Sequence, residues 1–423
     1  MPRTEGIPIT PHDLLTLDLD FHGESSSYAS HGLHAFAAKF PPQLPGAFID
    51  RLSGPGDVVL DPMNGSGTTT LEAYLRGRAA LGCDIDPLAV RIARVKITPV
   101  PGVHRLAGSV VESATGYLED DTAVREYMDG RFDTKTRQFI DYWFYPETQL
   151  ELAALRLATE DYPPGSTVRD LLEVVFSAVI VTKSGGVSRA RDLAHSRPHL
   201  DPAKGRRDAI RAFGQRLAKF APAMAELPDQ PTPAGIVQGS ARQLPVQDES
   251  VDLIVTSPPY ANAIDYVRAN KFSLVWLGQS VSGLGRLRGR YIGSEATRDT
   301  TMVPLSGSTD EVLRRLNALD PRKEAVLRKY YLEMRDALQE MGRVLVPGHY
   351  AVLVVGTSTM RGLDVKTPGC LADIAVRDAG FIVESVLRRS LDRDRRMMPF
   401  GKGGTLIERR MATEEVIVLK KPD

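Results

Sequence analysis

The segment Thr256-Ser-Pro-Pro-Tyr260 places a hydroxyl group, two prolines and an aromatic ring directly after the apolar run Val251 to Val255. Neither proline has an amide hydrogen, so a strand that enters this segment cannot continue its hydrogen-bond ladder through it. The prolines also restrict the backbone, and they would present the polar oxygens and the tyrosine ring as a rigid tip. A proline-terminated strand with a packing tyrosine is the alternative interpretation of this segment taken alone.

A second group of polar residues, Asp61 to Thr69, reads D-P-M-N-G-S-G-T-T and lies where a predicted strand meets a predicted helix. Glycines at such a junction let a ligand approach the backbone, and the helix N-terminus offers unpaired N–H groups to an anion. About twenty residues later a second predicted strand ends at Asp84, where an acidic side chain suits the two hydroxyls of a ribose. Asp86 is an alternative ribose ligand, or a cap for the next helix. The combination predicts a cofactor of the adenosine type.

The loop differs from two common nucleotide-binding motifs. It lacks the Gly-Lys-Ser/Thr sequence of a P-loop, and Gly67 is followed by three threonines rather than by the spacing of G-x-G-x-x-G. ATP and NAD therefore fit the loop poorly. A cofactor that carries a carboxylate, an amine and a ribose remains.

The elements that would position these groups alternate between strand and helix, which is typical of a doubly wound α/β fold with a parallel sheet. The region between the two motifs shows helical spacing without strand alternation. We predict an N-terminal arm at 1–30, a first cofactor-binding part at 31–100, a mostly helical insertion at 101–233, and a second part at 234–423 with a polar excursion at about 280–322.

With both motifs placed, the sequence resembles the DNA methyltransferases that use S-adenosylmethionine to methylate exocyclic amines, and among them the N4-cytosine enzymes. Asp61–Thr69 resembles the cofactor motif of that family, and Thr256–Tyr260 resembles its catalytic motif. The segment H-A-F-A-A-K-F-P-P, residues 34–42, is similar to the one that packs on the methionine part of the cofactor. The segment G-S-A-R-Q-L-P, residues 239–245, is similar to the third-strand motif, with Ser240 where an Asp is usual. The cofactor motif comes first, which is the unpermuted order, and a target-recognition region stands between the two motifs.

The resemblance implies a Rossmann-like class I methyltransferase sheet with a largely helical insertion domain, and it assigns roles to residues. The implied catalytic residues are Ser257, Pro258, Pro259 and Tyr260. The implied cofactor-binding residues are Lys39, Phe40, Pro41, Asp61, Pro62, Asn64, Gly65, Ser66, Gly67, Thr68, Thr69, Asp84, Ser240, Ala241 and Thr256. No metal is expected, because His195 and His199 are too sparse for a zinc site.

The chemistry of the family accounts for the rigid tip. The nitrogen of an aromatic amine is a poor nucleophile because its lone pair is delocalised into the ring. The Ser257 hydroxyl and the Pro258 carbonyl can accept the amine hydrogens, which draws the nitrogen towards sp³ geometry. Tyr260 can stack on a base that has been flipped out of the duplex, and the methyl group then transfers directly in line.

The prediction of the methylated base rests on two observations: no cysteine is placed as a nucleophile, and the catalytic motif begins with Ser257. Methylation of cytosine C5 requires a cysteine nucleophile, and neither Cys83 nor Cys370 follows a proline as that chemistry usually demands. In the family, Ser at the first position of the catalytic motif favours cytosine N4, whereas Asp favours adenine N6. Adenine N6 and an RNA amine are the alternatives, and a catalytically inactive DNA-binding protein of the same fold is the rival of another class.

Two basic segments are candidates for contacts with double-stranded DNA, because basic side chains among flexible residues suit phosphates and grooves. The candidate residues are Lys183, Arg189, Arg191 and Arg197 in the first segment, and Arg286, Arg288 and Arg290 in the second. A third basic stretch covers 388–404, and a solvated loop is the alternative for the first segment. Asn262, Asp265 and Tyr266 either shape the base pocket or cap the next helix. A cognate restriction endonuclease is a candidate partner.

Composition excludes several classes of protein. The chain has 423 residues, of which 42% are hydrophobic and 25% charged, and Lys+Arg equals Asp+Glu at 53 each, so net charge indicates no partner. Two cysteines exclude a disulfide framework. We find no signal peptide and no apolar run near the roughly 20 residues that a membrane helix needs. These features predict a cytoplasmic protein.

Overall fold

In a computed structural model, a seven-stranded sheet forms the centre of the protein, and its strand order is β10-β11-β7-β6-β1-β2-β5. The structure describes residues 17–180, 182, 186–191, 198–228, 232–261, 265–297, 303–305, 307–391 and 413–423. The strands of the sheet are β1 Val58–Asp61, β2 Ala79–Asp84, β5 Ala234–Gln238, β6 Val251–Thr256, β7 Leu345–Gly356, β10 Ile382–Ser390 and β11 Thr413–Lys420.

The strand directions define the fold. Strands β7, β6, β1, β2 and β5 are mutually parallel, whereas β11 lies antiparallel between β7 and β10. A parallel sheet with helical crossovers and a topological switch between β1 and β6 is the doubly wound arrangement. The predicted doubly wound, Rossmann-like sheet is therefore confirmed.

Helices cover both faces of the sheet, because parallel strands need crossover connections. Those near the sheet are η1 Ala29–Gly32, α2 Gln43–Leu52, α3 Thr68–Leu75, α4 Pro87–Lys96, α11 Tyr266–Trp276, α14 Pro321–Val344 and α15 Thr367–Ala379. Two others, α12 Leu284–Gly289 and α13 Gly307–Leu319, fall in the polar excursion, and a short pair, β8 Thr359–Met360 and β9 Leu363–Asp364, follows β7.

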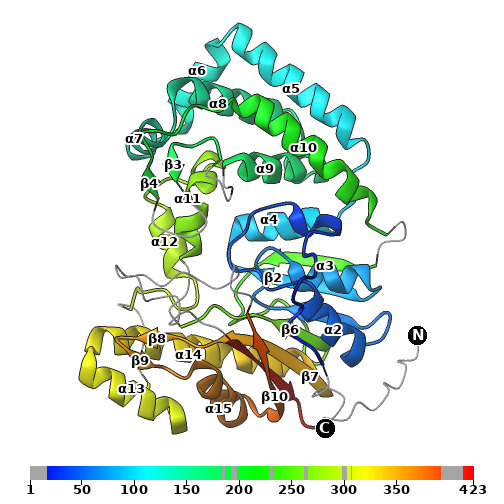
Figure 1. Ribbon diagram of the computed structural model, residues 1–423, viewed down its shortest axis with the longest axis vertical. Coiled ribbons are helices and arrows are strands. Elements are labelled where there is room, and N and C mark those ends of the chain that lie inside the picture. Colours follow the sequence, from blue (N-terminus) through cyan, green and yellow to red (C-terminus); the bar gives the residue numbers. More distant parts are fainter. Residues whose placement is uncertain are drawn as a thin grey trace.

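Between α4 and β5, the described residues form six helices. They are α5 Val103–Glu119, α6 Thr122–Arg131, α7 Thr134–Trp143, α8 Pro146–Glu160, α9 Thr167–Ile180 and α10 Ala209–Ala225. Figure 1 shows them gathered at one end of the molecule, with α13 to α15 at the opposite end. The region also contains a two-residue antiparallel pair, β3 Ala190–Arg191 and β4 His199–Leu200, where the sequence predicted no strand. Two residues are too few for a period-2 pattern to be visible.

The core is divided by the sheet, because successive side chains of a strand point to opposite faces. Val59 of β1 and Leu253 and Val255 of β6 pack in one buried cluster, whereas Leu60 and Ile254 pack in the other. The first cluster continues without a break into the helices of residues 103–225. The helical region therefore shares its hydrophobic core with one face of the sheet.

Helix α11 is the main bridge between that region and the catalytic motif. Its buried Trp276 packs edge-on against Phe132, Phe144 and Phe176, at ring-centroid distances of 5.4, 5.7 and 6.3 Å. Aromatic pairs of this kind add about 0.5–1.5 kcal/mol each beyond the burial of their area. Among the described residues, no helix is long and apolar enough to cross a membrane.

Candidate active site

The Gly-rich loop between β1 and α3 has a backbone that only glycine can easily adopt. Gly65 and Gly67 have φ angles of +49° and +78°. A side chain at Gly67 would also place its Cβ 2.7 Å from the Cβ of Ala93 on α4, so no residue other than glycine fits there. Gly67 precedes α3 without a side-chain cap, which leaves the first amides of the helix directed into the loop.

Asp84 closes the loop from the neighbouring strand. Its carboxylate accepts hydrogen bonds from the amide of Gly65 at 2.7 Å and from the amide of Asp86 at 2.8 Å. The amide of Gly239, just after β5, donates to the Asp84 carbonyl at 2.9 Å. The ends of β1, β2 and β5 are thus joined around one acidic side chain, as expected at the carboxyl edge of a parallel sheet.

Asp86, which the sequence left as either a ribose ligand or a helix cap, caps a helix. It is the N-cap of α4, where its side chain accepts from the amides of Leu88 and Ala89 at 2.8 and 3.4 Å. Its second oxygen accepts from Asn270 of α11 at 2.9 Å. Asp86 therefore has the capping role, and the assignment of Asp84 to the ribose stays a prediction.

Burial raises the pKa of two carboxyl groups at this edge. The pKa of Asp61 rises to about 6, although hydrogen bonds from Thr256 and Met63 act against the shift. The pKa of Asp84 rises to about 7, first through burial and then through the neighbouring Asp86 and Asp61. Desolvation disfavours a charged carboxylate, so these groups favour a cationic or hydrogen-bond-donating ligand.

Three aromatic side chains line this region, and none was named individually as a cofactor residue, although Phe36 belongs to the segment 34–42 that the resemblance places on the methionine part. Phe36 stacks on Tyr266 with ring centroids 5.6 Å apart and planes 16° from parallel, and a Cβ on Gly65 would lie 3.6 Å from Phe36. Burial raises the pKa of Tyr266 and Tyr291 to values above the usual range, and the charges of Asp84 and Asp86 add to both shifts. The signal available in the sequence was Phe36 inside the segment 34–42 and Tyr266 after the catalytic motif.

The remaining predicted cofactor residues fall around the same edge. Lys39 donates to the carbonyls of His31 and His34, both at 3.1 Å, so it fixes the segment before α2. Thr256 donates to Asp61 at 2.7 Å, which ties the end of β6 to the end of β1. The hydroxyl of Ser240 accepts from the amide of Arg242 at 3.3 Å, so it shapes a turn after β5.

The catalytic motif lies beyond the carboxyl end of β6. The Ser257 hydroxyl donates to the carbonyl of Val354 on β7 at 3.1 Å. The Tyr260 hydroxyl donates to Glu414 on β11 at 2.6 Å, and burial, with Glu414 second, raises the pKa of Tyr260 well above its usual value. Because Thr256 bonds to Asp61, the motif begins directly beside the strand that leads into the Gly-rich loop.

Known proteins resemble the chain in sequence. Residues 18–95 match the family model described as DNA methylase, and this span includes the Gly-rich loop and Asp84. The type II methyltransferase M.MvaI of Kocuria varians is 22% identical over 388 residues, which are 84% of this chain and 83% of that protein. The type II methyltransferase M.MjaII of Methanocaldococcus jannaschii is 39% identical over 83 residues, 20% of this chain and 16% of that protein.

These sequence similarities support a DNA amino-methyltransferase.

Solved structures show weaker similarity to this methyltransferase. A TehB-like SAM-dependent methyltransferase from Corynebacterium glutamicum is 12% identical with a TM-score of 0.29, over 89% of this chain and 86% of that one. The TTHA0409 protein of Thermus thermophilus, complexed with S-adenosyl-L-methionine, is 19% identical with a TM-score of 0.23, over 44% of this chain and 54% of that one. Both TM-scores are low, so the strand order of the sheet is what defines the fold.

S-adenosylmethionine is the cofactor of the methyltransferase, and the residues at the sheet edge fit it. The amide nitrogen of the buried Asn64, inside the Gly-rich loop, has no partner among the described residues. Asp84 would hold the ribose, and the Gly65–Gly67 loop would lie against the methionine part, which carries the carboxylate. When bound, the cofactor supplies an electrophilic methyl group.

The raised pKa of Asp84 predicts that cofactor affinity depends on pH. At pH 6 the free methyltransferase keeps most of this carboxyl protonated, because its pKa is about 7. Ribose hydroxyls donate better to the ionised form, so affinity for S-adenosylmethionine should rise by about tenfold between pH 6 and pH 8. Titration calorimetry across this range measures the effect, and the Asp84→Asn variant should bind more weakly with no such rise. A flat profile for the unaltered protein would contradict the assignment of Asp84.

The raised pKa values of Asp61 and Asp84 also affect the stability of the fold. Cofactor affinity should rise with pH, whereas the free energy of unfolding should fall. A carboxyl whose folded pKa lies above its unfolded value binds more protons in the folded state between the two values. The free energy of unfolding without cofactor should therefore fall as pH rises from about 4 to about 7, through Asp61 and Asp84 together. Unfolding in urea at the two ends of this range measures the change, and the Asp84→Asn variant should show a smaller one.

The arginines predicted to contact DNA have different surroundings. Arg286 and Arg290 on or beside α12 are exposed and form no ion pair among the described residues, whereas Arg288 pairs with Asp265 at 2.9 Å. Asp265 also accepts from the amide of Arg268 as the N-cap of α11, which is the capping role that the sequence left open. Helix α12 is thereby attached to the helix that follows the catalytic motif.

In the first basic segment, Arg189 and Arg191 both interact with other residues of the protein. Arg189 stacks on the ring of Tyr145 at 5.0 Å and donates to the carbonyl of Tyr142 at 3.3 Å, so it packs against the helical region. Arg191 pairs with Asp201 at 3.5 Å and is mostly exposed. Lys183, Arg197, Asn262 and the basic residues 392–404 lie outside the described residues.

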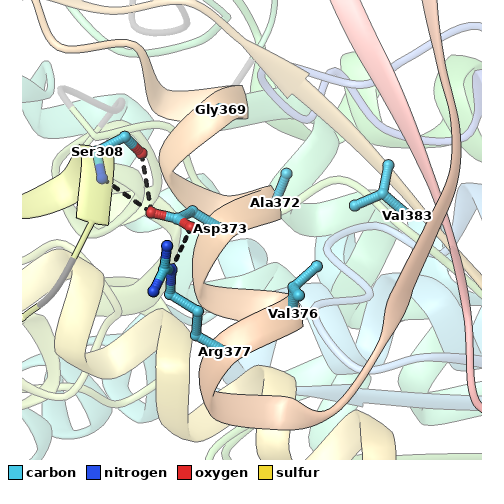
Figure 2. Close-up of a pocket in the computed structure, with 7 residues that line it drawn as sticks. All are labelled: Ser308, Gly369, Ala372, Asp373, Val376, Arg377 and Val383. Atoms are coloured by element: carbon cyan, nitrogen blue, oxygen red, sulfur yellow. Dashed lines mark hydrogen bonds and ion pairs between the residues drawn. The ribbon is translucent and has the colours of Figure 1, made fainter.

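A shallow depression elsewhere on the surface is separate from this site. It lies along α15, where Gly369, Ala372 and Val376 face Val383 of β10, and Asp373 bonds to Ser308 and pairs with Arg377 (Figure 2). It contains no residue of the cofactor loop or of the catalytic motif. We assign no chemistry to it.

Proposed function

We propose that the methyltransferase transfers a methyl group from S-adenosylmethionine to the N4 amine of cytosine at specific sites in duplex DNA. The Ser257 hydroxyl is the observation that carries this proposal. Its hydrogen is donated to the Val354 carbonyl at 3.1 Å, so its oxygen can act as an acceptor towards an incoming amine. A serine at this position also favours cytosine N4 in the family.

The chain's own groups would activate the amine. The Ser257 hydroxyl and the Pro258 carbonyl would each accept one amine hydrogen, which localises the nitrogen lone pair. Pro258 and Pro259 restrict the backbone that carries both acceptors, so little reorganisation is needed when the nitrogen attacks. The amine held by Ser257 and Pro258 would gain the methyl group that bound S-adenosylmethionine would supply, leaving the cofactor as a neutral thioether, and it would release one proton to solvent.

Access to the amine requires that the base leaves the duplex. The exocyclic nitrogen of a stacked cytosine cannot approach a group at the end of β6, so we propose base flipping, with Tyr260 stacking on the extruded base. Tyr260 is partly exposed, as such a stacking role requires.

Recognition of the DNA would involve the regions that flank this tip. We propose that residues 101–233 read the target sequence, and that the exposed Arg286 and Arg290 contact phosphates beside the flipped base. The relatives named as type II methyltransferases support a site-specific enzyme. A cognate restriction endonuclease is the corresponding candidate partner.

The proposal predicts the product directly. Duplex DNA incubated with the protein and S-adenosylmethionine carrying a labelled methyl group should become labelled, and digestion to nucleosides should yield N4-methylcytosine. Single-stranded RNA, tested alongside, should stay unlabelled. N6-methyladenine as the only product would replace cytosine by adenine, and no incorporation into any DNA would contradict the enzymatic function.

A further inference from the structure

The catalytic tyrosine is attached to the far end of the chain. The Tyr260 hydroxyl donates to the Glu414 carboxylate at 2.6 Å, although 154 positions separate the two residues. Glu414 is the second residue of β11, and only 8% of its surface is exposed. The bond is short and largely shielded from water, so it strongly restricts the position of the tyrosine ring.

Glu414 is itself held by a buried cation. Arg389 on β10 lies directly opposite Glu414 in the antiparallel register, and its guanidinium is 3.2 Å from the second carboxylate oxygen. Arg389 is 2% exposed, and its Nε has no partner among the described residues. Burying such a pair costs desolvation energy that an apolar pair would avoid, so its contribution to stability alone does not explain it.

The other end of the motif is held by the strand next to β11. Ser257 donates to Val354 on β7, and β11 pairs with β7 so that Glu414 lies opposite Gly356. The two polar side chains of the motif are therefore attached to adjacent strands at one edge of the sheet. Their separation is set by the register between β7 and β11.

We propose that Glu414 and Arg389 are positioning residues that hold the Tyr260 ring in the orientation needed against the flipped base. The proposal rests on the proposed function. Glu414 holds the hydroxyl end of the ring, and Arg389 holds Glu414 and neutralises its charge. Neither residue would need to touch the base or the cofactor. A ring fixed at its hydroxyl loses little further freedom when a base stacks on it, so the fixed ring favours formation of the reactive complex.

The test compares Glu414→Gln with Glu415→Gln. Glu415 is the next residue of β11, its side chain points to the opposite face, and that side chain has no hydrogen bond or ion pair in the described part of the chain. Glu414→Gln should lower kcat/KM for DNA by about tenfold to a hundredfold, because small misplacements of a positioned group cost that much. The Kd for S-adenosylmethionine should change little. The free energy of unfolding should fall, because Arg389 is left buried without its counter-charge, so rates are compared at a temperature where the variant is fully folded. Glu415→Gln should match the unaltered protein.

A double-mutant cycle separates positioning from general damage. Tyr260→Phe keeps the ring and removes its hydroxyl, so it should show a loss similar to that of Glu414→Gln. Combining the two should add little further loss, because both remove the same bond. Glu414→Asp, which keeps the charge on a shorter side chain, should recover part of the activity. Full activity of Glu414→Gln, or losses that simply add in the double variant, would overturn the proposal.

A measurement without DNA keeps this proposal distinct from the proposed function. In protein labelled with ¹³C at the tyrosine Cζ, the signal that disappears in Tyr260→Phe belongs to Tyr260. That signal should shift in Glu414→Gln and stay unchanged in Glu415→Gln. If the unaltered protein methylates no DNA but the signal shifts in this way, the proposed function fails and the attachment of Tyr260 stands. An unchanged signal in Glu414→Gln contradicts the attachment itself.

Discussion

Replacing Ser257 by alanine should lower kcat for methyl transfer by about 10²–10³-fold, the loss typical when one preorganised polar contact is removed from a reacting group. The variant keeps the Pro258 carbonyl, so one acceptor for the amine remains and some activity persists. The Kd for S-adenosylmethionine should be unchanged, because Ser257 bonds to Val354 and not to the cofactor loop. Single-turnover rates and calorimetry on the same samples measure both quantities.

The matched control for this prediction is Ser257→Thr. Threonine keeps a hydroxyl that can donate to the Val354 carbonyl and accept from the amine, so its kcat should lie well above that of the alanine variant. In Ser257→Ala, the loss of the bond to Val354 should lower the free energy of unfolding by only about 1 kcal/mol, which unfolding in urea can verify. Unchanged kcat in Ser257→Ala would remove Ser257 from the catalytic assignment.

Replacing Gly67 by alanine should destabilise the protein by about 2–4 kcal/mol and abolish measurable binding of the cofactor. Two costs combine: a non-glycine residue at φ +78° is strained, and its Cβ would lie 2.7 Å from Ala93 Cβ and 3.0 Å from Ala93 Cα. Neither atom of Ala93 belongs to a flexible side chain, so helix α4 itself would have to move. That movement displaces the loop on which the cofactor binds.

Gly56→Ala is the control that separates the two costs. Gly56 has φ +87°, but nothing lies within 4 Å of a Cβ added there. This variant should therefore lose only about 1–2 kcal/mol and keep its cofactor affinity. Equal losses in the two variants would mean that the contact with Ala93 is unimportant.

The fold was predictable because its signals are local. The buried strands β1 and β6 are short apolar runs, and each ends in residues that cannot continue a ladder, at Pro62 and at Pro258. Alternation of such strands with amphipathic helices leaves few arrangements besides a parallel sheet. The two-residue strands β3 and β4 escaped prediction because they are too short to show a pattern.

Some features of the site could be identified only from the tertiary structure. The sequence placed Asp84 and Asp86 two residues apart with the same chemistry, and only the tertiary structure shows that Asp86 caps α4 and accepts from Asn270. Phe36 and Tyr266 are 230 positions apart, so nothing in their spacing indicates that their rings stack. Arg189 looked free to contact DNA, yet its guanidinium lies over Tyr145.

The sequence by itself determined the groups that depend on neighbours along the chain: the glycine backbone of the loop, the rigid prolines of the catalytic motif and the order in which the two motifs occur. Tertiary structure alone decided which distant side chains meet those groups. Tyr260 reaches Glu414, and Glu414 reaches Arg389, because β11 lies between β7 and β10 in one register. A shift of that register by one residue would turn Glu414 to the other face, and no local pattern near Tyr260 specifies it.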